Sequence, residues 1–338
     1  MSLRSSVELE INGQILSQVE RLEVTCDLYK PSGSFSATIG LDARVEEASL
    51  VRIYLDGLPT LVGIIDQIDE SYDKNSHNRS ISGRSLIGLV EDTFVTSFGM
   101  PPSTIKDAAQ KYLAKIPHVS RFGMELAPEA SQSIAGRSMV DVGDTVFKVL
   151  SGLASSIGLI FWCAPDGRMT FGKLVSSGAS SYRLDRSVIQ RGQRGRGNGK
   201  IHSKFILISD NEEEGHRKVE VVNPTAPLER PFVAAFNGHS SDIKKQAQEY
   251  LRQERIQALQ LEYEVAGFSQ GGTVWAVNRL VDLVDDILCL EGTYILHRCA
   301  FSFDRRSGSR TRLSLSPRVG DPFKPAKTKK KAKQEVDL

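Results

Sequence analysis

The sequence predicts a multidomain α+β protein with two small antiparallel β-barrel modules and an inserted α+β unit. Alternating apolar and polar residues recur in short segments near the start of the chain and again after residue 258, which is typical of strands. Amphipathic segments with helical spacing lie between them. The chain has 338 residues and exceeds the roughly 250 to 300 residues at which a single core stops growing. Several domains are therefore expected.

The first β-barrel is assigned to residues 1–96. Its first strand, at 7–11, alternates apolar and polar side chains and leads into Asn12-Gly13, a strong signal for a two-residue hairpin turn. Further alternating segments follow and are joined by short turns. A closed or nearly closed barrel accommodates such strands better than an open sheet, because closure removes exposed strand edges.

An α+β unit is expected at residues 97–176. Ser103 or Thr104 caps a helix over 105–116, whose apolar side chains form one stripe. A second amphipathic helix begins near Asp144, and a buried hairpin around the turn PDGR follows it. This unit differs in kind from the opening module.

The rest of the chain divides into three parts. Residues 177–238 hold strands and a proline-punctuated linker, and the pattern leaves open whether they complete the first barrel or begin the second. A long helix and the second β-barrel are predicted for 239–323. Residues 324–338 carry six lysines and two acidic residues without periodicity, which predicts a disordered lysine-rich tail.

Charge and hydropathy restrict the function. The formal net charge is +2, and six lysines lie in the tail, so the body of the chain is slightly negative. Such a body argues against nucleic-acid binding by the whole surface. No apolar run reaches the roughly 18 to 20 residues of a membrane span, and the start lacks the apolar core of a signal peptide. A cytosolic protein without integral membrane association is expected.

The main candidate for a ligand contact is a basic, glycine-rich loop with the sequence RGQRGRGNGK. Backbone amides beside glycine can hold phosphates, but Arg194 and Ile201 stand where a phosphate-binding loop needs glycine and a hydroxyl side chain. We therefore expect a mobile loop at an interface or channel wall, with Arg191, Arg194, Arg196 and Lys200 as its basic residues. Electrostatic contact with DNA phosphates is the alternative.

Catalytic and metal-binding patterns are missing from the sequence. The six histidines never form HxxxH or HExxH pairs, and the nucleophile pattern GxSxG is absent. His297 and Cys299 share one face of a predicted strand, but two ligands are too few for a structural metal site. The four cysteines lack CxxC spacing, so buried free thiols are expected. The sequence predicts a protein that is not an enzyme and holds no metal or other cofactor.

Four sequence motifs carry a resemblance to a known family. In chain order they are GRSLIGLVED, GDTVFKVLSGLASSIGLIFWCAPDGRMTF, RPFVAAF, and GFSQGGTVWAVNRLVDLVDD followed by YILHRCAFSFDRRSGSRTRLSL. Together they resemble the baseplate hub proteins of Mu-like contractile phages, which belong with the late-control tail proteins. The resemblance spans roughly residues 5–323 and leaves out the lysine-rich tail.

The resemblance implies a structural hub in the virion tail baseplate of a phage or resident prophage, assembled in the host cytoplasm. A homotrimer with two related barrels per subunit would form a pseudo-six-fold ring, joining the tail tube to the central spike and surrounding the channel through which DNA passes. Other baseplate proteins are further partners. Trp275, Arg279, Asp282 and Asp285 are candidate subunit contacts, and Trp275 also suits a packing role.

Two other functions are weighed against the hub. A nucleic-acid-binding protein would use the Gly/Arg loop and the lysine tail, and its DNA binding would weaken as the salt concentration rises. A tail-associated cell-wall hydrolase is the third hypothesis, and the missing catalytic pattern counts against it.

Overall fold

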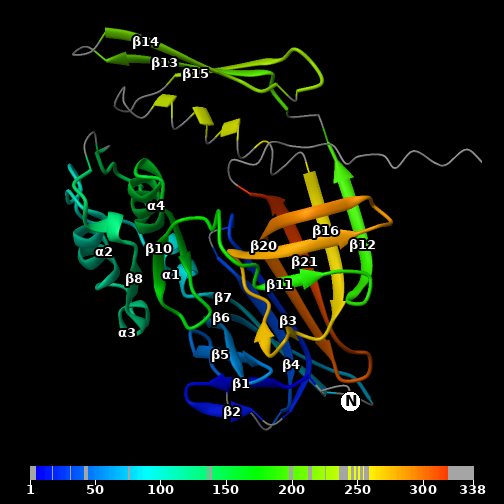
Figure 1. Ribbon diagram of the computed structural model, residues 1–338. Helices are drawn as coiled ribbons and strands as arrows, with labels where there is room; N and C mark the ends of the chain where they lie inside the picture. Colours follow the sequence, from blue (N-terminus) through cyan, green and yellow to red (C-terminus); the bar gives the residue numbers. More distant parts are fainter. Residues whose placement is uncertain are drawn as a thin grey trace, which may run out of the picture.

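The structure is a computed structural model of the chain. A large β-sheet, a compact α+β unit beside it and a small sheet above both make up the molecule (Figure 1). The structure describes residues 5–318 except 17, 31, 42–44, 75–76, 135–136, 138, 198–200, 212–214, 225, 236–242, 245–246, 249, 252–253 and 255–258.

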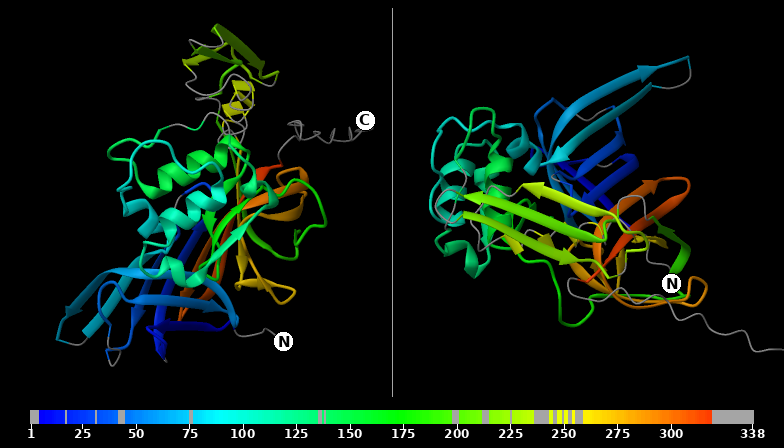
Figure 2. Two further views of the ribbon diagram at one scale, coloured as in Figure 1. Left: turned by 90° about the vertical axis from the view of Figure 1, so that its left-hand side faces the viewer. Right: turned by 90° about the horizontal axis from the view of Figure 1, so that it is seen from above.

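The first β-module begins with the predicted hairpin. Asn12 and Gly13 have φ angles of 48° and 86°, the left-handed values that a two-residue turn of this type requires. The far ends of strands β6 and β7 project beyond the rest of the sheet (Figure 2). The strands of this module are β1 Val7–Ile11, β2 Gln14–Leu16, β3 Val19–Asp27, β4 Ser34–Ile39, β5 Leu50–Leu55, β6 Leu58–Tyr72 and β7 His77–Ser85.

The second β-module draws strands from two parts of the sequence. β11 pairs with β19, and β12 pairs with β16. The first part of residues 177–238, whose place the sequence left open, therefore extends the second module. The strands are β11 Tyr182–Leu184, β12 Ile189–Arg196, β16 Leu259–Ala266, β17 Ser269–Gln270, β18 Thr273–Val274, β19 Arg279–Asp285, β20 Leu290–Asp304 and β21 Gly308–Pro317.

The two β-modules are halves of one sheet. β3 pairs with the second half of β20, from Asp27 opposite Arg298 to Arg21 opposite Asp304. The strand order is β12-β16-β21-β20-β3-β4-β7-β6-β5-β1-β2, and β19 and β11 branch from β20. The end strands β12 and β2 do not pair, and no sheet formed by the described residues is closed. The α+β class agrees with the structure, whereas the prediction of two closed barrels is not confirmed.

One long strand with a bulge connects the halves. β20 has 15 residues; its first half pairs with β19 and its second half with β3. A register shift between Leu296 and Arg298 separates the two halves. Such a bulge bends a strand and increases its twist, so β20 can pair with β19 along its first half and with β3 along its second half. The alternation of residues predicts which face of a strand is buried, but it does not predict the partner strand.

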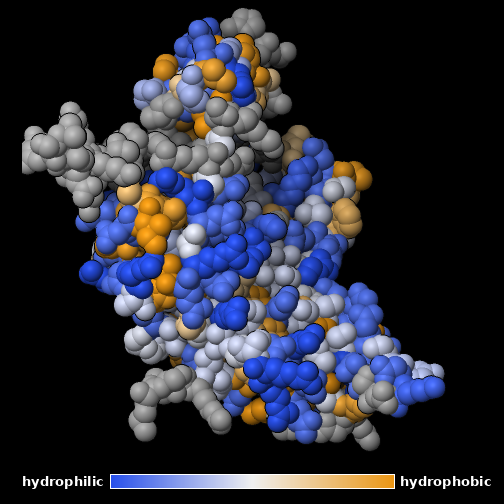
Figure 3. Space-filling view, turned by 90° about the vertical axis from the view of Figure 1, so that its right-hand side faces the viewer, coloured by the Kyte–Doolittle hydropathy of each residue, from blue (hydrophilic) through white to orange (hydrophobic). Residues whose placement is uncertain are grey.

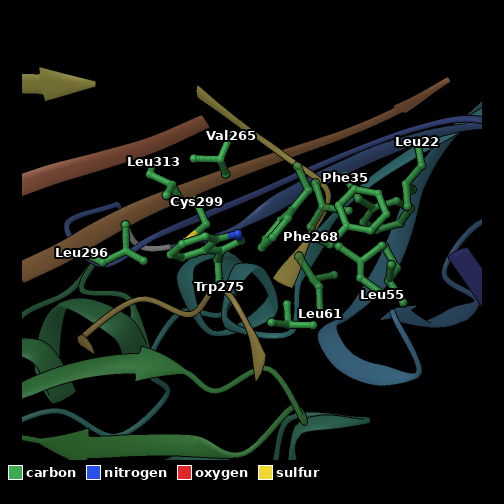
Figure 4. Close-up of a cluster of buried hydrophobic side chains, with 14 of the residues drawn as sticks. Leu22, Phe35, Leu55, Leu61, Val265, Phe268, Trp275, Leu296, Cys299 and Leu313 are labelled. Carbon is green, nitrogen blue, oxygen red and sulfur yellow. The ribbon is translucent and has the colours of Figure 1, made fainter. Parts of the chain in front are cut away.

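Both modules pack around a shared hydrophobic core. Phe35 of the first module lies beside Phe268 of the second, and Leu22 and Trp275 belong to the same cluster (Figure 4). Phe268 also makes an edge-to-face contact with Phe301, with ring centroids 6.1 Å apart. Because this core is common, the burial of apolar surface stabilises the two modules together.

The α+β unit packs around a second hydrophobic core, which also includes Val62 and Ile64 of β6. Thr104 Oγ1 accepts a hydrogen bond from Asp107 N at 3.0 Å, so Thr104 is the cap of the first long helix. Thr145 Oγ1 accepts one from Lys148 N at 3.2 Å and begins the second. The elements are α1 Ile87–Asp92, α2 Ile105–Leu113, α3 Val119–Phe122, β8 Met124–Leu126, the 3-10 helix η1 Pro128–Ser131, α4 Val146–Ser156, β9 Ile160–Cys163 and β10 Met169–Gly172.

A small sheet with the order β14-β13-β15 lies apart from the large one (Figures 1 and 2). Phe205 and Leu207 are buried against Ile243 and Ala247, which have helical backbone and are spaced as one helix face requires. Ile243 and Ala247 belong to the predicted long helix; its start at Ser240 and the lysine-rich tail lie outside the described residues. The strands are β13 Lys204–Asn211, β14 Gly215–Val222 and β15 Pro231–Ala235.

Candidate functional site

The candidate site is the junction between the two β-modules, which brings together the start, middle and end of the chain. At one end of the β3–β20 pairing, Arg21 Nε donates a hydrogen bond to Asp304 Oδ2 at 3.0 Å. At the other end, Leu28 N donates to His297 O at 2.8 Å. An exposed ion pair such as Arg21–Asp304 contributes only about 0–1 kcal/mol, so the backbone ladder and the shared core provide the main connection.

A short hairpin, β17–β18, fastens the junction from a second side. Ser269 Oγ donates to Asp56 Oδ2 of the first module at 2.6 Å. Gln270 Nε2 donates to Arg183 O at 2.7 Å, and Gln270 Oε1 accepts from Arg183 N at 2.8 Å. The hairpin therefore holds the turn after β5 and the strand β11 at the same time. The signal in the sequence is the Gly-Gly pair that forms its turn, which the sequence analysis did not use.

Tyr182 and Trp275 form the buried centre behind this hairpin. Tyr182 Oη donates to Val274 O at 2.5 Å and accepts from Ala276 N at 3.1 Å. The two rings lie 4.5 Å apart between centroids. Burial raises the pKa of Tyr182 to about 12, so the phenol keeps its proton and its donor role. Trp275 is only 2% exposed, which places it in the packing role.

Asp285 holds the turn between β19 and β20. Asp285 Oδ1 accepts from Ile287 N at 2.9 Å and Leu288 N at 3.0 Å, and Tyr263 Oη donates to its other oxygen at 3.0 Å. Arg194 Nη1 of β12 donates to Leu288 O at 2.8 Å. The carboxylate of Asp285 is buried and engaged within the chain, so its role here is to stabilise the turn.

The prediction of a glycine-rich loop over residues 191–200 is wrong for residues 191–196, because these residues belong to the edge strand β12, Ile189–Arg196. A Cβ atom on Gly192 would lie 2.9 Å from Tyr263 Cε1, and one on Gly195 would lie 3.3 Å from Gln260 Oε1. The glycines make room for side chains of β16 that lie across them, and they do not mark a loop.

The four predicted basic residues are not equivalent. Arg191 is exposed, whereas Arg194 is half-buried and hydrogen-bonded to Leu288 O. Arg196 has strand backbone, and Lys200 lies outside the described residues. The face that carries β12 and β16 combines hydrophilic residues with separate hydrophobic patches (Figure 3).

Arg279 and Asp282 lie exposed on β19, as candidate contacts require. Asp282 Oδ1 accepts hydrogen bonds from Ser180 Oγ at 2.6 Å and from Thr293 Oγ1 at 2.8 Å. These bonds favour the ionised carboxylate and lower the pKa of Asp282 below its ordinary value of 3.8. Asp282 thus connects the segment before β11 to β20.

The α+β unit carries exposed apolar side chains that were not predicted from the sequence. Gly99 and Val140 exchange backbone hydrogen bonds of 3.2 and 2.8 Å, which place two segments side by side. Large apolar side chains exposed close together are typical of interaction surfaces. We call this group the apolar ridge, and its exposed fractions are Phe94 59%, Phe98 57%, Met100 55%, Met139 63% and Val142 85%.

The side chains at the junction pack against one another and form hydrogen bonds. Among the residues that the structure describes, no group of three or more His, Cys, Asp or Glu side chains could hold a metal ion. Burial raises the pKa of both Cys26 and Cys163 to about 12, so their thiols stay protonated at neutral pH and are poor nucleophiles. Desolvation likewise lowers the pKa of His297.

Comparison with protein families supports the resemblance found in the sequence. Residues 6–85 match the family described as Mu phage baseplate assembly protein GpP-like, N-terminal. This match confirms the resemblance to Mu-like baseplate proteins for the first β-module. A search of curated proteins gave no match.

Solved structures share the fold over nearly the whole chain. A tail protein from Neisseria meningitidis MC58 superposes with a TM-score of 0.82 at 24% identity, covering 93% of this chain and 97% of the other. The 43 kDa tail protein of prophage MuSo2 from Shewanella oneidensis gives 0.80 at 18% identity, covering 93% and 98%. An E. coli component of the type VI secretion system, which is itself similar to T4 tail proteins gp27 and gp5, gives 0.58 at 13% identity, covering 94% and 79%.

Within the described ranges, no helix is both long and apolar enough to cross a membrane.

Proposed function

We propose that this protein is a structural hub of a phage or prophage tail baseplate. The observation that carries the proposal is the fusion of two β-modules into one sheet around one core, in a fold shared with two tail proteins over 93% of this chain. A hub must transmit load between a tube and a spike, and a continuous backbone ladder suits that role because its hydrogen bonds resist shear together.

The hub acts as a homotrimer in this proposal. Three copies with two β-modules each present six similar units, which matches a six-fold tail tube on one side and a three-fold spike on the other. The apolar ridge supports self-association, because large exposed apolar side chains are costly on an isolated subunit. The ring would surround the channel for DNA, and assembly would take place in the host cytoplasm before the hub enters the virion tail.

The proposed hub is not an enzyme. Asp285 and Tyr263, which form a buried acid and phenol pair, hold a turn, and the thiols of Cys26 and Cys163 are protonated at neutral pH. Nucleic-acid binding through the predicted loop has less support, since Arg194 is engaged with Leu288 O.

Light scattering coupled to gel filtration tests the proposal. At micromolar concentration we expect a mass near three times the 37.2 kDa of one chain. A strictly monomeric protein over that concentration range would contradict the hub. A trimer that also binds short duplex DNA in a salt-dependent manner would instead favour the nucleic-acid alternative.

A further inference from the structure

A cavity of about 260 Å³ lies where three parts of the chain meet. Its wall includes Cys26 and Leu61 of the first β-module, Trp162 of the α+β unit, and Val274 and Trp275 of the second β-module. A wholly apolar cavity of about 150 Å³ already accepts benzene in another protein, so this volume is large enough for one aromatic ring.

Three polar side chains of the wall are paired within the chain, whereas the buried Nε1 of Trp275 has no hydrogen-bond partner. Thr60 Oγ1 donates to Leu58 O at 3.2 Å, and Ser85 Oγ accepts from Gly33 N at 3.0 Å. Cys26 Sγ donates to Thr60 O at 3.8 Å. A bound water molecule needs two to four free polar partners, which such a wall offers poorly. The cavity therefore favours an apolar occupant over ordered water.

The charges of the wall limit the occupant further. Asp27 is the one charged residue among the described residues that line the cavity, and its Oδ1 accepts a hydrogen bond from Tyr29 N at 2.9 Å. No lysine or arginine in the described chain lines it. An anion would meet a carboxylate in a poorly solvated site without a compensating cation, so anionic ligands are excluded.

We infer that this junction cavity is a binding site for a small neutral aromatic ring. An occupant would contact both β-modules and the α+β unit at once, because all three contribute to the wall. This inference does not depend on the proposed hub function, since it concerns a site inside one chain.

Tryptophan fluorescence provides a direct test, because the chain has two tryptophans and both line the cavity. Bromobenzene, whose heavy atom quenches indole fluorescence, is titrated into the full chain, with N-acetyltryptophanamide as the reference for collisional quenching. We expect saturable quenching by bromobenzene and only the linear collisional component with 4-bromobenzoate. Linear quenching by bromobenzene, or equal saturable quenching by the two compounds, would overturn the inference.

Substitutions that fill the cavity test whether the ring binds there. Ala276→Phe places a ring in the cavity itself and should abolish the saturable component, while Ala266→Phe on an exposed position of β16 should leave it unchanged. Ala164→Phe fills the cavity from the α+β unit and replaces Ala276→Phe if circular dichroism shows that the latter fails to fold. Saturable quenching that survives both filling variants would place the ring elsewhere and refute the site.

The same titration identifies the source of the ring. N-acetylphenylalaninamide is added as a competitor of bromobenzene. Displacement means that the side chain of another protein can supply the ring, and lack of displacement means that the ligand is a free compound. Either result is compatible with the site.

Discussion

Ser269 Oγ and Asp56 Oδ2 lie 2.6 Å apart although 213 positions of the sequence separate them. The other oxygen of Asp56 accepts a hydrogen bond from Ser6 N at 3.0 Å. One carboxylate thus connects the start of the chain, the turn after β5 and the β17–β18 hairpin. The contact lies at the edge of the shared core and joins the two β-modules. A substitution that removes it therefore tests whether the two modules unfold as one unit.

Ser269→Ala should lower the free energy of unfolding by about 1–2 kcal/mol, since it removes a hydrogen bond to a charged group. Urea denaturation followed by tryptophan fluorescence measures the change, and we expect a single transition. Ser307→Ala, at an exposed position, is the control and should change stability by less than about 0.5 kcal/mol. Equal effects of the two substitutions, or two separate transitions, would contradict the model of one unit.

Gly83→Ala should destabilise the chain severely, by more than about 3 kcal/mol, or prevent folding. A Cβ atom at Gly83 would lie 2.0 Å from Ile64 O and 2.8 Å from the ring of Phe35. Relieving these clashes requires a shift of the strand backbone or of a packed core ring, and both cost considerable free energy. Gly152→Ala is the matched control, because Gly152 lies in α4 with nothing within 4 Å of the added atom. It should be neutral or stabilise by up to about 1 kcal/mol. Thermal unfolding by circular dichroism compares the two.

Asp282→Asn should show an effect that depends on pH. The pKa of Asp282 is lowered in the folded state by the hydrogen bond from Ser180 and then by that from Thr293. The folded protein therefore binds fewer protons at this site, so the contribution is present above the ordinary value of 3.8 and is lost as the pH falls through the lowered pKa. The urea concentrations at the unfolding midpoints of the wild type and of Asp282→Asn should differ at pH 7 and become equal in acid. A difference that stays constant down to the acid limit would argue against this role.

Cys289 should react with Ellman's reagent well before the other cysteines. Cys289 is exposed, whereas burial holds the pKa of Cys26, Cys163 and Cys299 far above neutrality. Native protein should release about one equivalent of thionitrobenzoate quickly and the rest only after denaturation. Cys289→Ser should remove the fast phase, and its persistence would mean that one of the other three thiols is reactive in the folded protein.

Phe98→Asp should weaken self-association without reducing stability. The substitution places a charge on the apolar ridge. Because Phe98 is 57% exposed, the folding stability of an isolated subunit should change little. Light scattering should then detect a smaller mass than for the wild type at the same concentration. Tyr72→Asp, at an 85% exposed residue on the projecting end of β6, is the control. An unchanged mass for Phe98→Asp would exclude the ridge as the contact.

Local elements were predictable because their causes are local. The turn at Asn12-Gly13, the cap at Thr104 and the antiparallel hairpin β9–β10 each follow from a few neighbouring residues. The basic strand β12 was missed for the opposite reason. The glycines at 192 and 195 suggested a loop, and only the side chains of β16 explain them as a requirement for space.

The candidate site was the least predictable part. Of the proposed contacts, Arg279 and Asp282 are exposed, whereas Trp275 and Asp285 are buried in the junction. A tryptophan among turn residues has the same local pattern in either setting, so burial cannot be read from its neighbours. The partner of Trp275 is Tyr182 of β11, and only the structure shows that the two rings are in contact.

The sequence by itself determined the strands of the first β-module and the long strands after residue 258, together with the helical unit between them and the resemblance to Mu-like baseplate proteins, because periodicity and turn residues act over short distances. The tertiary structure decided that Cys26 of β3 lies opposite Cys299 of β20, and with it that two expected barrels are one open sheet. Strand alternation specifies a buried face, and many strands could satisfy it equally well. Pairing across the chain was selected by the packing of the common core, a property of all the strands together.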